Sequence, residues 1–399
     1  MLTSLSLIFL VGLAMGAICR KLKLPRIIGM LVTGIVLGPY VLEWLDPSIL
    51  SISADLRKMA LIIILLKAGL SLDLQDLKKA GRSAVLLSFV PASCELLGYV
   101  LLAPVILGIT RVEAAVMGAV LAAVSPAVVV PRMVSLMEKK YGTDKAIPQM
   151  ILAGASCDDI FVIVLFTTFL GMAQGGSADM MDFVNIPVSI VLGILLGAVV
   201  GYGLYLFFET AYARKHCVRN SMKVIIVLGF SFLLIAIEGW LEGKIAVSGL
   251  LAVVSMACVI KLKSTTFVSK RLSEKFGKLW LAAEVMLFVL VGAAVDIRYT
   301  LKAGVAAIIM ILAALVFRSI GVLLCVAGTK LTWKERLFCV IAYLPKATVQ
   351  AAIGSVPLAA GLSCGNIVLS VAVMAIVITA PLGALGIDSS YKKLLKHEL

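Results

Sequence analysis

The sequence has few charged residues, few aromatic residues and no cluster of cysteines. Charged residues make up 15% and aromatic residues 7% of the 399 residues, whereas 62% are hydrophobic and the mean hydropathy is +1.11. This composition excludes an ordinary soluble domain, in which about half of the residues are apolar. The eight cysteines lack the paired spacing of metal ligands and most lie in apolar stretches, so we interpret them as packing residues. We therefore expect no resident cofactor.

Basic residues exceed acidic ones, with 36 Lys and Arg against 22 Asp and Glu. Such an excess can indicate nucleic-acid binding, but no basic patch interleaved with aromatic residues occurs. Lys and Arg instead gather in short clusters between apolar stretches, and every second connection is the basic one. This is the charge pattern of a membrane protein. We expect membrane lipid, and no nucleic acid, as a partner.

Apolar stretches of about 17–25 residues recur along the chain, which is the length needed to cross a hydrocarbon layer ~30 Å thick. They predict an all-α polytopic membrane protein with about thirteen transmembrane helices. The predicted spans are residues 3–19, 26–44, 57–72, 83–108, 112–136, 147–173, 185–208, 221–240, 245–262, 279–296, 301–328, 335–361 and 364–387.

The connections between these spans alternate in charge, which predicts the topology. The alternation predicts an integral protein of the cell (inner) membrane, with its N-terminus on the outer side and its C-terminus on the inner side. The basic connections are residues 20–26, 78–82, 139–145, 214–223, 261–278, 330–336 and the tail 392–396, and the acidic or neutral ones are 43–55, 179–182, 238–242 and 362–366.

Segment 264–279 is too charged to span a membrane. We predict an amphipathic linker helix in the cytoplasmic interface between two halves of the protein, with an ordinary basic loop as the alternative. Prolines interrupt apolar segments at Pro126 and Pro131 in the first half and at Pro345 and Pro357 in the second. Paired interruptions of this kind indicate an inverted-repeat transporter with its binding site at the two breaks.

Two adjacent acidic residues, Asp158 and Asp159, lie near the middle of the sixth predicted span. An ionised carboxylate at the bilayer centre costs at least ~2.5–3.5 kcal/mol, so the pair predicts a functional site. Burial and mutual repulsion disfavour two charged carboxylates, so a proton and a cation can compete for the same site. Because neighbours on a helix point ~100° apart, we expect the two residues to have different roles.

The interrupted fifth span is the expected partner of this pair. Proline cannot donate a backbone hydrogen bond, so Pro126 and Pro131 leave carbonyl groups free. Freed carbonyls near residues 123–125, together with the Ser125 hydroxyl, would offer a hard cation oxygen ligands. A simple proline kink is the alternative.

Three further charged residues, Arg318, Lys346 and Glu95, fall deep in predicted spans. Each cation needs an acidic partner or a water-filled cavity, and Asp158, Asp159 and Glu95 are the candidates. Snorkelling to an interface is the alternative.

Four segments together resemble a known family. PRIIGMLVTGIVLGP (residues 25–39) is similar to the second-helix motif of the cation/proton antiporter superfamily. AAVSPAVVVP (122–131), GASCDDI (154–160) and LPKATVQAAIG (344–354) resemble the NHA-type sodium/hydrogen exchangers, including bacterial homologues. The resemblance extends over essentially the whole chain.

The resemblance implies a homodimer that works by an elevator-like alternating access. It implies a core ion-binding domain (about 57–173 and 279–361) and dimerisation elements (about 1–56, 185–262 and 364–387). It further implies crossed, unwound helices at 122–131 and 344–350 with the Asp pair between them.

The resemblance also implies residue roles. Asp159 corresponds to the principal ion and proton site, Lys346 to a lysine of the second broken helix, and Glu95 and Arg318 to a buried ion pair. We expect exchange of Na⁺ (or Li⁺) for H⁺, with Na⁺ bound by Asp158 and Asp159. The expected site comprises these two residues with Ser125 and backbone oxygens near Val124 and Ala155.

Two departures from the family bear on mechanism. Related electrogenic exchangers carry Lys where this chain has Arg318, and Arg keeps its proton. Ser125-Pro126 stands where many relatives have Thr-Asp-Pro, which removes one carboxylate. The proton-to-cation ratio therefore stays open.

Alternatives within transport are a potassium/proton antiporter and a sodium-coupled organic-anion symporter of related fold. An enzyme is not expected, because an intramembrane aspartic protease needs two carboxylates close enough to share a proton. Adjacent residues on one helix diverge.

Overall fold

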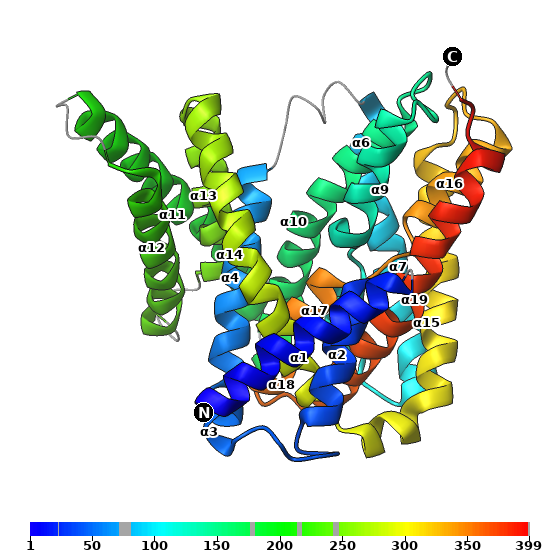
Figure 1. Ribbon diagram of the computed structural model, residues 1–399, viewed down its shortest axis with the longest axis horizontal. Coiled ribbons are helices and arrows are strands. Elements are labelled where there is room, and N and C mark those ends of the chain that lie inside the picture. The colour runs from blue at the N-terminus through cyan, green and yellow to red at the C-terminus, as the bar shows by residue number, and fades with distance from the viewer. Residues whose placement is uncertain (23, 72–80, 176–179, 214–217, 242–246, 398–399) are drawn as a thin grey trace. The chain divides into compact units, whose positions relative to one another are not determined.

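The computed structural model describes residues 1–22, 24–71, 81–175, 180–213, 218–241 and 247–397, and these residues are mostly helical (Figure 1). No β-strand occurs among them, so the predicted all-α fold class is confirmed. The helices are α1 (Leu2–Lys21), α2 (Arg26–Leu37), α3 (Pro47–Ser51), α4 (Ser53–Ser71), α6 (Gly81–Leu87), α7 (Val90–Leu107), α8 (Arg111–Leu121), α9 (Pro126–Glu138), α10 (Ile147–Gln174), α11 (Met180–Ala213), α12 (Asn220–Leu241), α13 (Gly249–Lys263), α14 (Thr266–Ala293), α15 (Ile297–Cys325), α16 (Trp333–Ala342), α17 (Thr348–Gly354), α18 (Val356–Ala359) and α19 (Gly365–Leu394).

Eight helical segments of the described chain are long and apolar enough to cross a membrane. They lie in α1, α6–α7, α10, α11, α12, α14, α15 and α19. Each of the thirteen predicted spans overlaps at least one helix, but several of these are short or interrupted. The chain is thus a membrane protein with several apolar helices, and the count of thirteen crossings stays a prediction.

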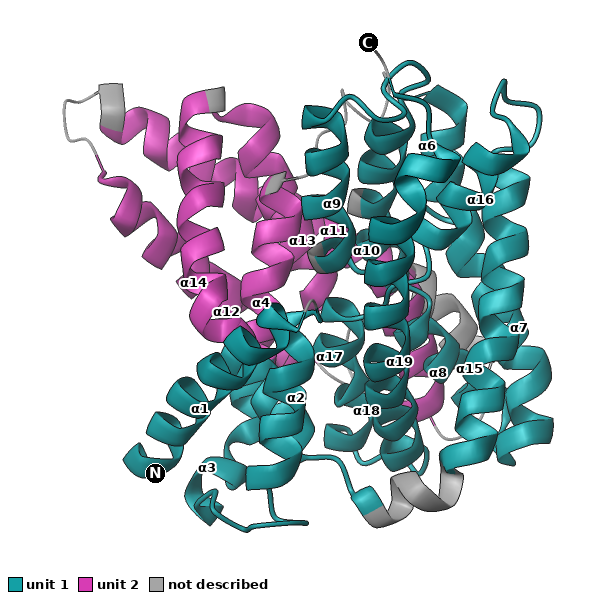
Figure 2. Ribbon diagram, turned by 45° about the vertical axis from the view of Figure 1, so that its right-hand side comes forward, with its two compact units in different colours: residues 1–57, 73–162, 285–399 teal, residues 58–72, 163–284 magenta. Residues whose placement is uncertain are grey.

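The chain forms two compact units (Figure 2). Unit 1 comprises residues 1–57, 73–162 and 285–399, and unit 2 comprises residues 58–72 and 163–284. The predicted core and dimerisation elements follow different boundaries, since α1, α2 and α19 pack with the helices of unit 1. The division into moving and static parts therefore stays a prediction.

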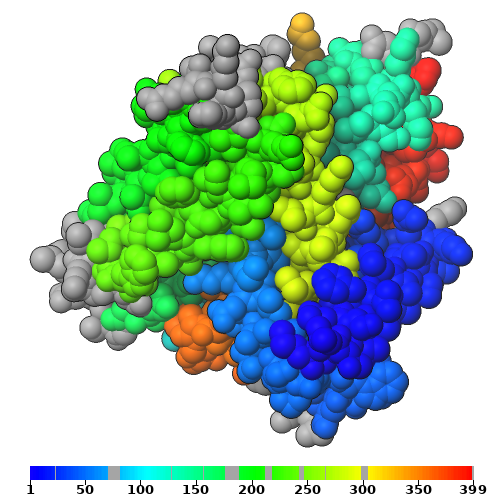
Figure 3. All heavy atoms as spheres, turned by 60° about the vertical axis from the view of Figure 1, so that its left-hand side comes forward, coloured from blue at the N-terminus to red at the C-terminus, as the bar shows by residue number. Residues whose placement is uncertain are grey.

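Helix α19 lies at the centre of unit 1, where it contacts α8, α9, α15, α16, α17 and α18. Helices α7 and α15 pack side by side, as do α1 and α2 (Figure 1). Close packing depends on glycine: a Cβ at Gly34 of α2 would overlap the carbonyl oxygen of Val289. Helix α1 lies at the surface in Figure 3. Its apolar side chains Leu10 and Leu13 are exposed. An exposed apolar helix face suits contact with lipid or another protein.

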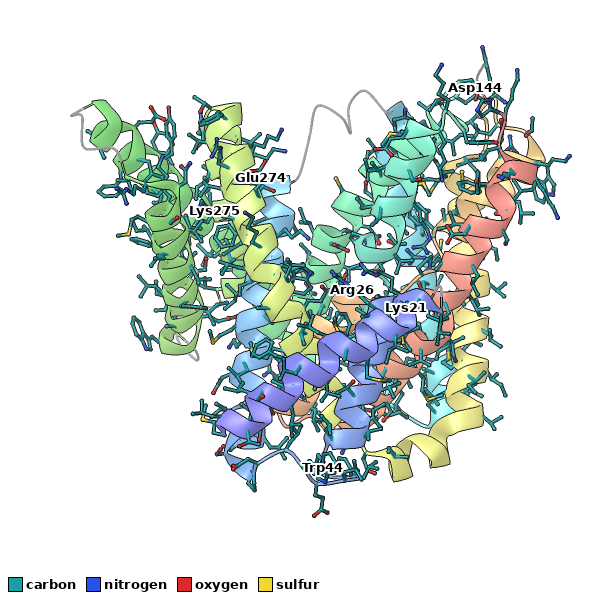
Figure 4. The ribbon with its side chains drawn as sticks, viewed as in Figure 1. Lys21, Arg26, Trp44, Asp144, Glu274 and Lys275 are labelled. Atoms are coloured by element: carbon teal, nitrogen blue, oxygen red, sulfur yellow. The ribbon has the colours of Figure 1, made fainter. Side chains whose placement is uncertain are left out.

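Unit 2 is built on α13, which packs against α11 and α12. A Cβ at Gly197 would overlap the carbonyl oxygen of Ala252, so the α11 and α13 backbones approach closely there. Lys275, labelled in Figure 4, donates to the Ser221 hydroxyl at 2.9 Å. The structure has one continuous helix, α14, from Thr266 to Ala293. The sequence predicted instead a separate linker helix over 264–279, and its place in the membrane interface stays a prediction.

Two helical segments of unit 1 are interrupted in the same way. Helix α8 ends at Leu121 and α9 begins at Pro126, while α16 ends at Ala342 and α17 begins at Thr348. Proline suits the first position of α9, because its missing N–H would have no partner there. The helices that lead into the breaks also begin alike, since capping boxes start α8 (Thr110 with Glu113) and α16 (Thr332 with Glu335).

Trp44 and Asp144 lie at opposite ends of unit 1 (Figure 4). The sequence places Trp44 in an acidic connection and Asp144 in a basic one. The two classes of connection are therefore separated in space at these positions.

Candidate functional site

The Asp pair lies in α10, and both side chains are buried. The backbone N–H of Val124 donates to Asp158 Oδ2 at 2.7 Å, and Arg318 Nη2 lies 3.6 Å from the same oxygen. Asp159 differs: its Oδ1 is buried without a hydrogen-bond partner among the described residues, and no ion pair there includes it. Asp158 thus has one backbone donor and one nearby guanidinium, whereas Asp159 Oδ1 has no hydrogen-bond partner among the described residues.

The two helix breaks meet beside this pair. The backbone N–H of Ser125, in the first break, donates to the carbonyl of Pro345, in the second, at 2.8 Å. The Ser125 side chain is fully buried, and its Oγ has no hydrogen-bond partner within the described part of the chain. Val124 and Ala155 are also fully buried. All five residues that the sequence suggested for the site therefore lie in the interior of unit 1.

Glu95 of α7 joins the two buried cations. Its Oε2 accepts from Arg318 Nη1 at 2.8 Å, and its Oε1 lies 2.7 Å from Lys346 Nζ. None of these three side chains is exposed. The pairing of Glu95 with Arg318 that the resemblance implied is present, and Glu95 is the partner that Lys346 required. Buried charges persist when they are paired in this way.

The carbonyl groups freed at the first break already accept hydrogen bonds. Leu121 O accepts from Lys346 Nζ at 2.5 Å, and Ala122 O accepts from Arg318 Nη1. Ala123 O accepts from Gln350 Nε2 at 2.8 Å. The Ala123 carbonyl was expected to be free for a cation. This expectation is corrected, because the carbonyl accepts a hydrogen bond from Gln350 of the second half.

Gln350 was missed in the sequence, although it is fully buried in α17 at the centre of the site. An uncharged polar residue in an apolar segment gives a weak signal, whereas the neighbouring charges stand out.

Metal-binding clusters give no further candidate. No group of three or more His, Cys, Asp or Glu side chains able to hold a metal ion occurs among the residues that the structure describes. Among the described residues, the buried oxygen atoms without a hydrogen-bond partner include Asp158 Oδ1, Asp159 Oδ1 and Ser125 Oγ, together with Thr348 Oγ1 in the second half. Hard monovalent cations bind such oxygens.

Comparison with known proteins identifies the family. The family model described as "Sodium/hydrogen exchanger, transmembrane" matches residues 5–389. The chain belongs to the sodium/hydrogen exchanger family. Exchangers of this family are transporters, not enzymes, and they move Na⁺ and H⁺.

Curated relatives place the chain more narrowly within the exchanger family. Sodium/hydrogen exchanger 9B2 of Homo sapiens is 34% identical over 400 residues, covering 94% of this chain and 70% of that protein. Sodium/hydrogen exchanger 9B1 of Homo sapiens is 32% identical over 380 residues, covering 91% of this chain and 71% of that protein. The predicted resemblance to NHA-type cation/proton antiporters is confirmed.

A solved structure has the same fold. The sodium proton antiporter MjNhaP1 from Methanocaldococcus jannaschii at pH 8 superposes with a TM-score of 0.83 at 21% identity, covering 98% of both chains. At this identity the likeness establishes the exchanger fold alone.

Proposed function

We propose that this exchanger moves Na⁺, and also Li⁺, in exchange for H⁺ by alternating access, with Asp158 and Asp159 as the ion and proton site. One observation carries the proposal. Asp159 is a buried carboxylate whose Oδ1 has no hydrogen-bond partner among the described residues, directly beside Asp158, which accepts from Val124 N–H and lies 3.6 Å from Arg318 Nη2. A buried carboxylate without a donor needs a proton or a cation, and antiport consists of the alternation between these two.

Charge counting explains why the site should cross the membrane only when it is loaded. Glu95 and Asp158 oppose Arg318 and Lys346, so the formal charges of these four residues cancel. Asp159 is left as one additional carboxylate. Either a proton or a monovalent cation neutralises it, whereas an empty ionised Asp159 would cost at least ~2.5–3.5 kcal/mol within the membrane. That cost opposes uncoupled movement of the empty site.

The partnerless oxygens supply the remaining ligands in this proposal. Asp158 Oδ1, Asp159 Oδ1 and Ser125 Oγ would bind the cation, and backbone oxygens near Val124 and Ala155 would complete the shell. Lys346 and Arg318 hold the carbonyls of the first break and pair with Glu95.

The proposed architecture is an inverted-repeat homodimer of thirteen spans, with the two broken helices crossed. The paired breaks and the matching capping boxes of α8 and α16 support the repeat. The separation of Trp44 from Asp144 supports an N-terminus outside and a C-terminus inside. In this proposal the core (about 57–173 and 279–361) moves against dimerisation elements (about 1–56, 185–262 and 364–387).

The test is proton flux in proteoliposomes with a trapped pH dye. Adding Na⁺ or Li⁺ to the wild type should dissipate a preset pH gradient, while choline should not. Asp159→Asn should remove the response, and Asp388→Asn, an exposed surface carboxylate, should keep it. A response to K⁺ in place of Na⁺ would reassign the ion, and no response to any cation would overturn the proposal. The family match favours this reading over an organic-anion symporter.

A further inference from the structure

We propose that Gln350 is a positioning residue for the ion site, which it orients through the peptide group that joins Ala123 to Val124. The inference rests on the proposed function, in which Asp158 binds the cation. It adds a residue of the second half of the chain that touches neither carboxylate.

The peptide group between Ala123 and Val124 makes a hydrogen bond on each side. Gln350 Nε2 donates to the carbonyl of Ala123 at 2.8 Å. The N–H of Val124, in the same peptide group, donates to Asp158 Oδ2 at 2.7 Å. In a trans peptide the C=O and N–H point in opposite directions, so the two hydrogen bonds pull on one rigid plane. Rotating that plane would break both bonds together.

These two hydrogen bonds determine which oxygen of Asp158 faces the cation. Because Val124 N–H holds Oδ2 of Asp158, Oδ1 is left without a hydrogen-bond partner among the residues that the structure describes. Hydrogen bonds in a chain also polarise one another, so donation by Gln350 to the carbonyl strengthens donation by the N–H. Loss of the hydrogen bond from Gln350 would let the Ala123–Val124 peptide plane rotate. Neither oxygen of Asp158 would then have a fixed position.

The carboxamide of Gln350 is itself immobilised. Its Oε1 accepts from the N–H of Ala347 at 2.8 Å, which satisfies a free backbone donor at the start of α17. Its Nε2 also lies 3.5 Å from Leu121 O, and the side chain has no exposed surface. The second break therefore holds Gln350, and Gln350 holds the first break.

Gln350 is the uncharged member of the set that binds the first break. Lys346 and Arg318 take the two preceding carbonyls, Leu121 and Ala122, and both also pair with Glu95. Loss of either cation would change the charge of the site. Loss of the Gln350 amide leaves the formal charge of the site unchanged, so it separates positioning from net charge.

The experiment compares wild type with Gln350→Met and Gln350→Asn in the proteoliposome assay. Met removes the amide at similar volume, and Asn retracts it by one methylene. The matched control is Gln149→Met on α10, where Gln149 Oε1 has no hydrogen-bond partner among the described residues. Half-saturating Na⁺ and Li⁺ and maximal rate are measured for each, with thermal unfolding to verify folding.

We expect both Gln350 variants to raise the half-saturating Na⁺ about three- to tenfold, the effect of one hydrogen bond, with a smaller change in maximal rate. The ratio of Li⁺ to Na⁺ half-saturation should also change, because ligand placement matters more for the smaller ion. Gln149→Met should match the wild type in both.

The outcomes separate this inference from the proposed function. Unchanged half-saturation in a folded Gln350→Asn protein overturns the positioning role while exchange itself stands. If Gln350→Met does not fold, Gln350→Asn decides alone. A wild-type chain that exchanges no cation overturns the proposed function and this inference with it.

Discussion

Arg318 Nη1 donates to Glu95 Oε2 across 2.8 Å in the interior of unit 1, and neither side chain is exposed. The two residues are 223 positions apart in the sequence. Lys346 pairs with the same carboxylate, so one acidic residue of α7 binds two cations of the second half. The pair thus ties the first half of the chain to the second at the ion site.

Replacing Glu95 should destabilise the protein more than any surface carboxylate does. Glu95→Gln removes the carboxylate that pairs with both Arg318 and Lys346, and Asp158 remains as an ion-pair partner of Arg318. Breaking a buried pair in this way costs about 3–5 kcal/mol. The control, Asp388→Asn, breaks the exposed pair with Arg132 and should cost at most about 1 kcal/mol. Thermal unfolding in detergent compares the two variants, and equal losses would contradict the structural role of Glu95.

Replacing Asp158 and replacing Asp159 should affect the stability of the protein differently but should abolish exchange alike. Asp158→Asn and Asp159→Asn should each abolish exchange. Asp158→Asn should also cost about 1–3 kcal/mol, because Arg318 loses a charged partner. Asp159→Asn should cost nothing, because no described donor binds Asp159. Exchange by dye assay and Tm by scanning fluorimetry test this, and full exchange in both variants would refute the assignment.

Arg318→Lys should change the number of protons exchanged per Na⁺. Arg keeps its proton, whereas a buried Lys can lose one. The ratio of H⁺ to Na⁺ should therefore rise, as measured from the ion gradients at which flux reverses under a potassium/valinomycin clamp. Tm should fall as well, because one ammonium replaces a guanidinium that binds Tyr343 O, Ala122 O and Glu95. An unchanged ratio would remove residue 318 from the proton pathway.

Gly34→Ala should be poorly tolerated despite its small size. The added Cβ would overlap Val289 O, so α2 would have to shift at a cost of about 1–3 kcal/mol. Gly304→Ala in α15 is the control, because nothing lies within 4 Å of its Cβ position. There the higher helix propensity of Ala should stabilise the protein by up to about 1 kcal/mol. Tm values of the two purified variants should move in opposite directions, and a similar shift in both would contradict the packing.

Asp46 provides a carboxylate that should not affect the pH dependence of exchange. Its hydrogen bonds with Ser48 lower the pKa of Asp46 to about 2. A carboxylate with a lowered pKa stabilises the fold above its ordinary value near 4 and loses that effect as the pH falls toward 2. Asp46→Asn should therefore leave the pH profile of exchange between pH 6 and 9 unchanged. A shifted profile would show that this connection communicates with the ion site.

The site could be predicted from the sequence because of its charged residues. Asp158, Asp159, Glu95, Arg318 and Lys346 stand out in apolar segments because charge in a membrane is costly, and the structure gathers all five in one unit. The prolines likewise marked both breaks, at Pro126 and Pro345.

Two features could not be predicted because they depend on three-dimensional contacts. Which side chain reaches which freed carbonyl is set by packing, so the occupation of Ala123 O by Gln350 was missed. The continuity of α14 was missed because its basic first half and apolar second half read as separate elements, although no proline lies between them.

The long separation of Glu95 from its two cations has a consequence for biogenesis. The ribosome completes α7 more than two hundred residues before it reaches Arg318 and Lys346. Until those residues emerge, Glu95 has neither partner, so α7 reaches the membrane before the two cations that pair with its carboxylate. The first half of the transporter therefore cannot complete its packing helix by helix. It needs Arg318 and Lys346 of the second half to pair with Glu95.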